Sequence, residues 1–172
     1  AALNSLRNVY AFQQAVGNQR GTVVVPAIDY TREGNFGGVA MDSQPSGERV
    51  PLCVLDDLRL PACHLLKIDV EGMEQHVLEG AASVIARFKP VIYLEADAPG
   101  QAGPLVRQLE ALSYKMYWHE SRYFNPRNFF GNQEDVFPGV VSRNMVCVHE
   151  SAPHELSSLE AVTTASTEEP TP

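Results

Sequence analysis

The chain has 172 residues, of which 44% are hydrophobic and 20% are charged, and its formal net charge is −8. This composition is that of a single globular domain. The excess of acid disfavours binding to nucleic acid or to an anionic membrane surface, because both attract basic proteins. No apolar run reaches the length of a membrane span. We therefore expect a protein that binds neither nucleic acid nor membrane.

The first third of the chain predicts strands separated by a polar insertion. We expect a strand over residues 9–12, a turn over residues 17–21 and a β-branched strand over residues 22–27. Residues 30–49 are rich in Gly, Ser, Pro, Asn and charge, which predicts an inserted loop or irregular hairpin over the sheet edge. The sequence over residues 55–58 then leads through a turn into the next strand.

A short apolar strand, residues 64–68, runs directly into two acids, Asp69 and Glu71. Gly72 permits a tight turn after them. Over residues 73–85, apolar side chains then recur at helical spacing. The segment therefore predicts a strand that ends on carboxylates and is followed by a helix.

A second apolar strand, residues 91–94, also ends on acids, Glu95 and Asp97. The connection between the two strands contains a helix and is long enough for a right-handed crossover, so the strands should lie parallel. Both would then present their carboxylates at one edge of the sheet, where open α/β sheets bind ligands. Asp69, Glu71 and Glu95 are therefore our candidate catalytic residues.

The remaining elements predict the other end of the sheet. Pro104 suits the first turn of a helix whose apolar face carries three leucines. Residues 115–119 and 144–149 predict two final strands, joined by a long loop rich in Asn, Pro and Phe.

Residues 151–172 are rich in Ser, Thr, Glu and Pro and contain few apolar side chains. Such a segment cannot bury enough surface to offset the entropy of ordering it, so we expect a disordered tail. The folded domain is expected to cover residues 1–150.

Several segments together resemble the FkbM-type methyltransferases. The main one is KIDVEGMEQHVLEGA followed by RFKPVIYLEAD, and the others are NVYAFQQAVGNQRG, NFGGVAMD, VPLCVLDDL, YFNPRNFFGN and SRNMVCV. They follow the family's order over residues 4–149. The resemblance implies an S-adenosylmethionine-dependent O-methyltransferase with an α/β, Rossmann-like class I fold. Its doubly wound sheet would be mostly parallel, with the last two strands as an antiparallel edge pair.

One part of the family pattern is missing from this sequence. Family members begin with a strand, a glycine-rich turn and a helix that hold the methionine part of the cofactor, and with a second strand whose final acid binds the ribose. The glycine-rich residues 34–38 follow no apolar strand and open no helix, so they do not provide that turn. We therefore expect residues 1–150 to be the C-terminal portion of a methyltransferase, in which residues 4–50 lack their usual neighbours. The exposed edge of the strand over residues 64–68 favours a homodimer.

Methyl transfer to a hydroxyl requires alignment of the reactants and loss of the hydroxyl proton. The acidic strand ends suggest two routes. In the first, Asp69 or Glu71 is the general base. In the second, Asp69 and Glu95 bind a hard divalent cation such as Mg²⁺, which acidifies the hydroxyl. For the cofactor itself we predict contacts from Asp69 and Gln14.

These acids also have a purely structural interpretation. Asp69 would then cap the following helix, and Glu95 would face solvent. Lys67, within the strand, is expected to extend to the sheet edge or to pair with an acid rather than to act in the site.

The loop over residues 123–132 combines aromatic side chains with amides, which suits a small-molecule or glycan acceptor that carries hydroxyl groups. His119, at the end of the preceding strand, is also a second candidate base. Alternatively, the phenylalanines of the loop pack inward and its asparagines only form turns. We predict acceptor contacts from five residues: His119, Tyr123, Asn125, Asn128 and Asn144.

The three cysteines, Cys53, Cys63 and Cys147, are odd in number and have no CxxC spacing, which favours reduced core thiols in a cytoplasmic protein. Two other functions stay open at this point. One is another doubly wound α/β enzyme with acidic strand ends, such as a hydrolase. The other is a non-enzymatic fragment or interaction module.

Overall fold

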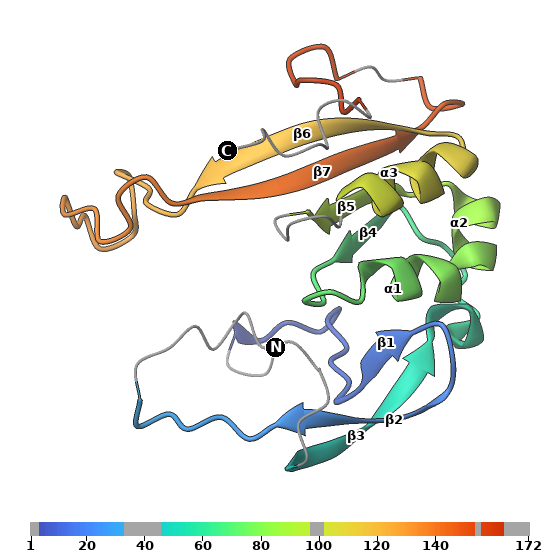
Figure 1. The fold of residues 1–172 in the computed structure, drawn as a ribbon, viewed down its shortest axis with the longest axis horizontal. Coiled ribbons are helices and arrows are strands. Elements are labelled where there is room, and N and C mark those ends of the chain that lie inside the picture. Colours follow the sequence, from blue (N-terminus) through green and yellow to red (C-terminus); the bar gives the residue numbers. More distant parts are fainter. Residues whose placement is uncertain (1–3, 33–45, 97–101, 154–155, 164–172) are drawn as a thin grey trace.

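A computed structural model describes residues 4–32, 46–96, 102–153 and 156–163. These residues form an α/β fold with two mixed sheets, one of three strands and one of four (Figure 1). None of the helices within the described ranges has the length and apolar character needed to cross a bilayer. In chain order the elements are β1 (Ala15–Gly17), β2 (Gly21–Pro26), β3 (Gly47–Val54), the 3-10 helix η2 (Leu55–Leu58), β4 (Leu65–Ile68), α1 (Glu74–Gly80), α2 (Ala82–Phe88), β5 (Val91–Glu95), α3 (Ala102–Ala111), β6 (Tyr114–Arg122) and β7 (Val141–His149).

The N-terminal sheet has the strand order β1-β3-β2. Strand β3 is parallel to β1 and antiparallel to β2. The strand predicted over residues 22–27 is confirmed as β2, which pairs with β3. The insertion predicted over residues 30–49 is wrong at its end, because β3 already begins at Gly47, and residues 33–45 lie outside the described residues. The strand predicted over residues 9–12 is wrong, since sheet pairing begins at Ala15. The apolar residues before it have no core to enter, and Tyr10 is 80% exposed.

The second sheet has the strand order β4-β5-β7-β6. Strands β4 and β5 are parallel, and β7 is antiparallel to both of its neighbours. The predicted parallel pair and the predicted antiparallel edge pair are therefore confirmed. A mostly parallel sheet is not confirmed, because both described sheets are mixed. Within the described residues β4 pairs only with β5, and Leu65 on its edge is 62% exposed; dimerisation through this edge stays a prediction.

The helices cover one face of the four-stranded sheet. Alternate residues of each strand enter a single apolar cluster with the helices, as the two-residue period of a strand requires. The predicted leucine face of α3 is confirmed, since Leu105 and Leu109 are fully buried. Burial of one such side chain contributes about 1.5–3 kcal/mol. The main strand residues of the cluster are Ile68, Ile92, Leu94, Met145 and Cys147.

The helix predicted over residues 73–85 forms as two helices that are separated at Ala81. The carboxylate of Asp56, on η2, accepts hydrogen bonds from the backbone N–H groups of Ser83 (2.8 Å) and Val84 (2.9 Å). These donors lie in the first turn of α2, where no intrahelical acceptor is available. Asp56 is therefore a helix cap supplied by another element, and it explains why a new helix begins after Ala81.

Helix α1 lies between the two sheets (Figure 1). Gly80, at its end, packs directly on β1, since a Cβ atom there would overlap the carbonyl oxygen of Gly17. Beside this contact, Asn18 Nδ2 donates a hydrogen bond to Glu79 Oε2 at 2.6 Å. The N-terminal strands therefore pair with one another and dock on α1. The expectation that residues 4–50 lack their usual neighbours stays a prediction.

The prediction of a disordered tail over residues 151–172 is wrong for the residues of it that the structure describes, 151–153 and 156–163. The N–H of Trp118 donates to the carbonyl of Glu160 at 2.8 Å, and the N–H of Val162 donates to the carbonyl of Met116 at 2.9 Å. Val162 is buried by this pairing. The prediction failed because these hydrogen bonds come from the free edge of β6, which cannot be inferred from the composition of the tail. Residues 164–172 lie outside the described residues.

The contact between Gly80 and Gly17 predicts a loss of stability on Gly80→Ala. Within a helix, this substitution normally stabilises by about 0.5–1 kcal/mol. Here the added methyl group meets backbone, and overpacking costs about 1–3 kcal/mol, so the midpoint of urea unfolding should fall. The matched control is Gly21→Ala on β2, where an added Cβ has nothing within 4 Å. A midpoint raised by Gly80→Ala would contradict the described packing.

Candidate functional site

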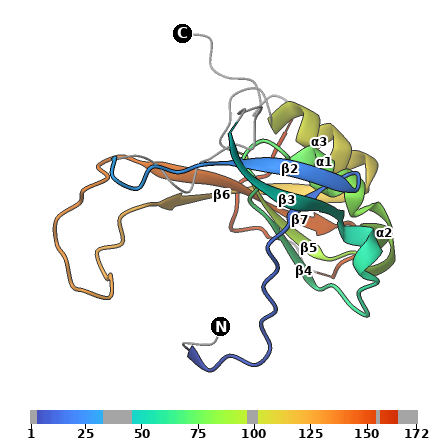
Figure 2. The ribbon, with the colours of Figure 1, turned by 90° about the horizontal axis from the view of Figure 1, so that it is seen from below.

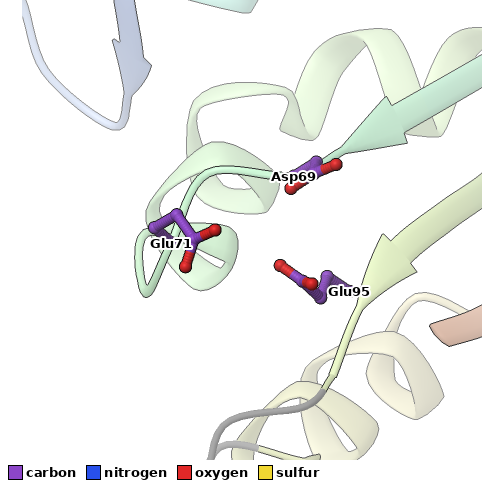
Figure 3. A group of neighbouring side chains, drawn as sticks. All are labelled: Asp69, Glu71 and Glu95. Atoms are coloured by element: carbon purple, nitrogen blue, oxygen red, sulfur yellow. The ribbon is translucent and has the colours of Figure 1, made fainter. Parts of the chain in front are cut away.

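Two acidic residues follow adjacent parallel strands. In the pairing of β4 with β5, Ile68 lies opposite Leu94, so the next residues, Asp69 and Glu95, come side by side. The side chains of Asp69, Glu71 and Glu95 converge on a common space (Figure 3), and one oxygen of each lies within 4.8 Å of the others. The predicted meeting of these acids at one sheet edge is confirmed, whereas their chemical roles stay predictions. Asp97 lies outside the described residues.

The turn between β4 and α1 holds Glu71 in this cluster. Glu71 and Gly72 both have left-handed backbone conformations, with φ of 47° and 94°. This conformation suits glycine but costs a residue with a side chain about 1–2 kcal/mol. Glu74 offsets part of this cost: it is only 3% exposed, and its Oε1 accepts the N–H of Gly72 at 3.0 Å. A buried carboxylate therefore stabilises the turn that directs Glu71 toward Asp69.

The structural interpretation of Asp69 as a helix cap is wrong. The residue that precedes α1 is Met73, and no side chain caps this helix. Asp69 instead forms an ion pair with Lys67, so the predicted pairing of Lys67 with an acid is confirmed. Both side chains are about half exposed, and a pair of this kind contributes little to stability. Asp69 can therefore exchange Lys67 for another partner at low cost. Glu95 is half-buried within the cluster rather than turned to solvent.

The strand register extends the acidic edge across the sheet. Glu95 lies opposite Asn144, and Asn144 lies opposite His119. Directly opposed residues project from the same face, and the neighbouring Leu94 belongs to the core on the other face. Glu95, Asn144 and His119 therefore form a row on the face away from the helices. Asn144 is 8% exposed, and its Nδ2 donates to Ser142 Oγ at 2.8 Å.

Tyr93 belongs to this face and was not among the predicted site residues. It lies two residues before Glu95 on β5. Its hydroxyl oxygen is 2.9 Å from Nδ1 of His119, and the two rings meet edge to face with centroids 5.7 Å apart. The two-residue spacing of Tyr93 and Glu95, within an otherwise apolar strand, is the sequence signal that identifies it.

The loop between β6 and β7 extends away from the body of the protein in both views (Figure 2). Its amide side chains bond to its own backbone. Asn128 Nδ2 donates to the carbonyls of Asn125 (3.0 Å) and Asn132 (2.6 Å), and Asn125 Oδ1 accepts the N–H of Arg127 at 2.9 Å. The expectation that the asparagines form turns is confirmed. Acceptor contacts from Asn125 and Asn128 stay predictions and would have to compete with these bonds.

The two adjacent phenylalanines of this loop face outward. Phe129 is 96% exposed and Phe130 is 89% exposed, and their rings meet edge to face. The alternative in which these phenylalanines pack inward is therefore wrong. Tyr123 is 54% exposed and packs its ring on Phe137. The loop offers apolar ring surface to a ligand, and the acceptor role of Tyr123 stays a prediction.

Gln14, the second predicted cofactor contact, lies on the segment before β1. It lines a hollow of about 260 Å³ over the N-terminal sheet, and this lining includes none of the clustered acids. Ligand sites usually have volumes of about 300–1,000 Å³. Beside it, Gln13 Nε2 donates to Glu48 Oε1 at 2.7 Å. The cofactor contact of Gln14 therefore stays a prediction.

The cysteines do not take part in the acidic site. All three are free thiols. Cys147 is buried on β7, and burial raises the pKa of its thiol well above the ordinary value. Burial also raises the pKa of the Cys63 thiol, which is half-buried. The predicted reduced core thiol is confirmed for Cys147, and a cytoplasmic location stays a prediction.

The arrangement of Asp69, Glu71 and Glu95 limits the chemistry that this edge can perform. Carboxylates accept hydrogen bonds but donate none when ionised, and three of them in one space repel unless they share a proton or a cation. Such a group can remove a proton from a ligand. It can also hold a hard divalent cation, because an all-oxygen set favours Mg²⁺, Ca²⁺ or Mn²⁺ over zinc.

Comparison with known families gives one match. A family model described as "Methyltransferase FkbM domain" matches residues 2–116. These residues include the three acids, the turn after β4 and Tyr93. No curated protein and no solved structure matches the chain.

The hydrogen bond between Glu74 and Gly72 predicts the exchange rate of one amide. Glu74→Ala removes an acceptor whose charge-assisted bond contributes about 1.5–3 kcal/mol, so the Gly72 amide should exchange with deuterium at least about tenfold faster. Glu74→Gln keeps an acceptor oxygen and should have a smaller effect. Unchanged Gly72 exchange in Glu74→Ala, measured by NMR, would show that the buried carboxylate does not hold the turn.

Proposed function

The chain belongs to the FkbM methyltransferase domain family, and from this we infer that it is the catalytic portion of an S-adenosylmethionine-dependent O-methyltransferase. The observation that carries this proposal is the convergence of Asp69, Glu71 and Glu95 at the ends of two parallel strands, inside the matched residues. S-adenosylmethionine, when bound, supplies an electrophilic methyl group. The residues of this chain have to hold an acceptor hydroxyl in line and to take its proton.

Two routes for the proton fit the acidic edge. In the first, Asp69 or Glu71 accepts the proton directly as the general base. Asp69 is half exposed and can be reached by an acceptor. In the second, Asp69 and Glu95 would hold Mg²⁺, which would supply a positive charge that makes the acceptor hydroxyl more acidic. All three carboxylates lie close enough to share one ion.

The acceptor in our proposal is a small molecule or a glycan with a free hydroxyl group. His119 and Asn144 continue the row that begins at Glu95, on the sheet face away from the helices. A ring seated on this face would have its hydroxyl between the acids and His119. The exposed rings of the β6–β7 loop supply apolar surface on which a sugar or aromatic ring can stack.

The contacts to the methionine and ribose parts of the cofactor are proposed to come from outside these 172 residues. The sequence has no glycine-rich turn between an apolar strand and a helix, which is the structure that binds these parts in such folds. Residues 1–150 would then be the C-terminal portion of the methyltransferase domain.

This proposal predicts that the 172-residue chain binds S-adenosylmethionine weakly or not at all. Calorimetric titration of the purified chain measures the affinity directly. A dissociation constant in the low micromolar range would contradict the assignment of the cofactor contacts to another segment.

The assignment of the catalytic edge predicts the effect of Asp69→Asn in a longer chain that includes the glycine-rich turn for the cofactor, here called the cofactor loop. The substitution keeps size but removes the base or the metal ligand, so methyl transfer should fall at least about a hundredfold. Asp57→Asn is the matched control, because Asp57 lies on η2 and pairs with Arg20 rather than with the clustered acids. Wild-type turnover in both Asp69→Asn and Glu95→Gln would refute the assignment.

Removal of divalent cations separates the two routes. If Asp69 and Glu95 hold a metal, a chelator should abolish methyl transfer by the wild-type enzyme, and added Mg²⁺ should restore it. If Asp69 or Glu71 is the base, the chelator should have no effect on turnover.

A further inference from the structure

The contact between Tyr93 and His119 joins two strands that are not neighbours. Tyr93 is on β5 and His119 is on β6, with β7 between them. Neighbouring strands lie about 4.8 Å apart, so the tyrosine side chain has to extend across β7 to reach the imidazole. It does so diagonally, because Tyr93 lies opposite Val146 while His119 lies opposite Asn144. The contact therefore depends on the register of three strands.

The contact occupies one of the two ring nitrogens of His119. The Tyr93 hydroxyl oxygen lies 2.9 Å from Nδ1. In a neutral imidazole one nitrogen carries the proton and the other has a lone pair, and the partner of one nitrogen decides the state of the other. A hydroxyl can accept from Nδ1–H, which leaves the lone pair on Nε2. The edge-to-face contact of the two rings also restricts rotation of the imidazole.

The position of His119 would allow the lone pair on Nε2 to accept a hydrogen bond from the methyl acceptor. His119 ends the row that contains Glu95 and Asn144, on the face where our proposed function seats the acceptor. An acceptor hydroxyl is a hydrogen-bond donor, so it needs an acceptor nitrogen or oxygen to orient it.

We propose that Tyr93 is a positioning residue that holds His119 in its Nδ1–H tautomer, so that Nε2 accepts a hydrogen bond from the acceptor hydroxyl. The proposal rests on the methyltransferase function proposed above, which it deepens on the acceptor side. The tautomer itself is a property of the folded chain and can be measured whether or not methyl transfer is observed.

The test is the ¹⁵N NMR spectrum of the histidine side chains in the 172-residue chain, at a pH where imidazole is neutral. The chain has five histidines, and the His119 signals are assigned by their loss in His119→Gln. In the wild type, Nδ1 should have the chemical shift of a protonated nitrogen and Nε2 that of an unprotonated one. In Tyr93→Phe, the two shifts should move toward each other or exchange.

Tyr117→Phe is the matched control. Tyr117 is on β6, two residues before His119, and its side chain projects from the same face. Loss of its hydroxyl should leave the His119 shifts unchanged. A wild-type Nε2–H tautomer, or a Tyr93→Phe spectrum identical to that of the wild type, would overturn the proposal.

A second measurement connects the tautomer to the reaction. In a longer chain that includes the cofactor loop, Tyr93→Phe should lower kcat for methyl transfer by about tenfold, as expected for the loss of one positioning hydrogen bond. Tyr117→Phe should keep the wild-type kcat. Equal kcat values for Tyr93→Phe and the wild type would overturn the role of Tyr93 in the reaction, even if the tautomer is as described.

Discussion

The parallel pairing of β4 with β5 is the constraint on which the acidic site depends. Ile68 and Leu94 lie opposite each other in this pair, and both are fully buried in the apolar core. A register shift of one residue would move one of them out of the core and would turn Glu95 toward the helices. The core therefore sets the position of Asp69 beside Glu95, and hydrophobic burial determines where the carboxylates meet.

A second constraint keeps the N-terminal strands away from the face with the polar row. The N-terminal sheet docks on α1 through the close contact of Gly80 with Gly17, and η2 caps α2 through Asp56. These contacts place the N-terminal strands on the helical side. The opposite face of the four-stranded sheet carries Tyr93. The acids Asp69 and Glu95 lie on this same face, at the ends of β4 and β5. The same fold thus packs its main apolar cluster on one face and presents Asp69, Tyr93 and Glu95 on the other.

The sequence predicts correctly those elements whose pattern is local. The strands β2, β4 and β5, the helix α3 and the meeting of the acids after β4 and β5 all follow from apolar periods and from the crossover between parallel strands. It does not predict features that depend on distant partners. The break at Ala81 requires Asp56, 27 residues before Ser83, and the burial of Val162 requires the edge of β6. The bond of Tyr93 to His119 likewise depends on the strand register.

The most direct test of the account is a crystal structure with bound S-adenosylhomocysteine, the product that the cofactor leaves after methyl transfer, in a longer chain that includes the cofactor loop. The account predicts that the thioether sulfur lies at the edge formed by Asp69 and Glu95, on the sheet face that carries Tyr93 and His119. A sulfur bound in the hollow beside Gln14, with the three acids exposed to solvent, would contradict it.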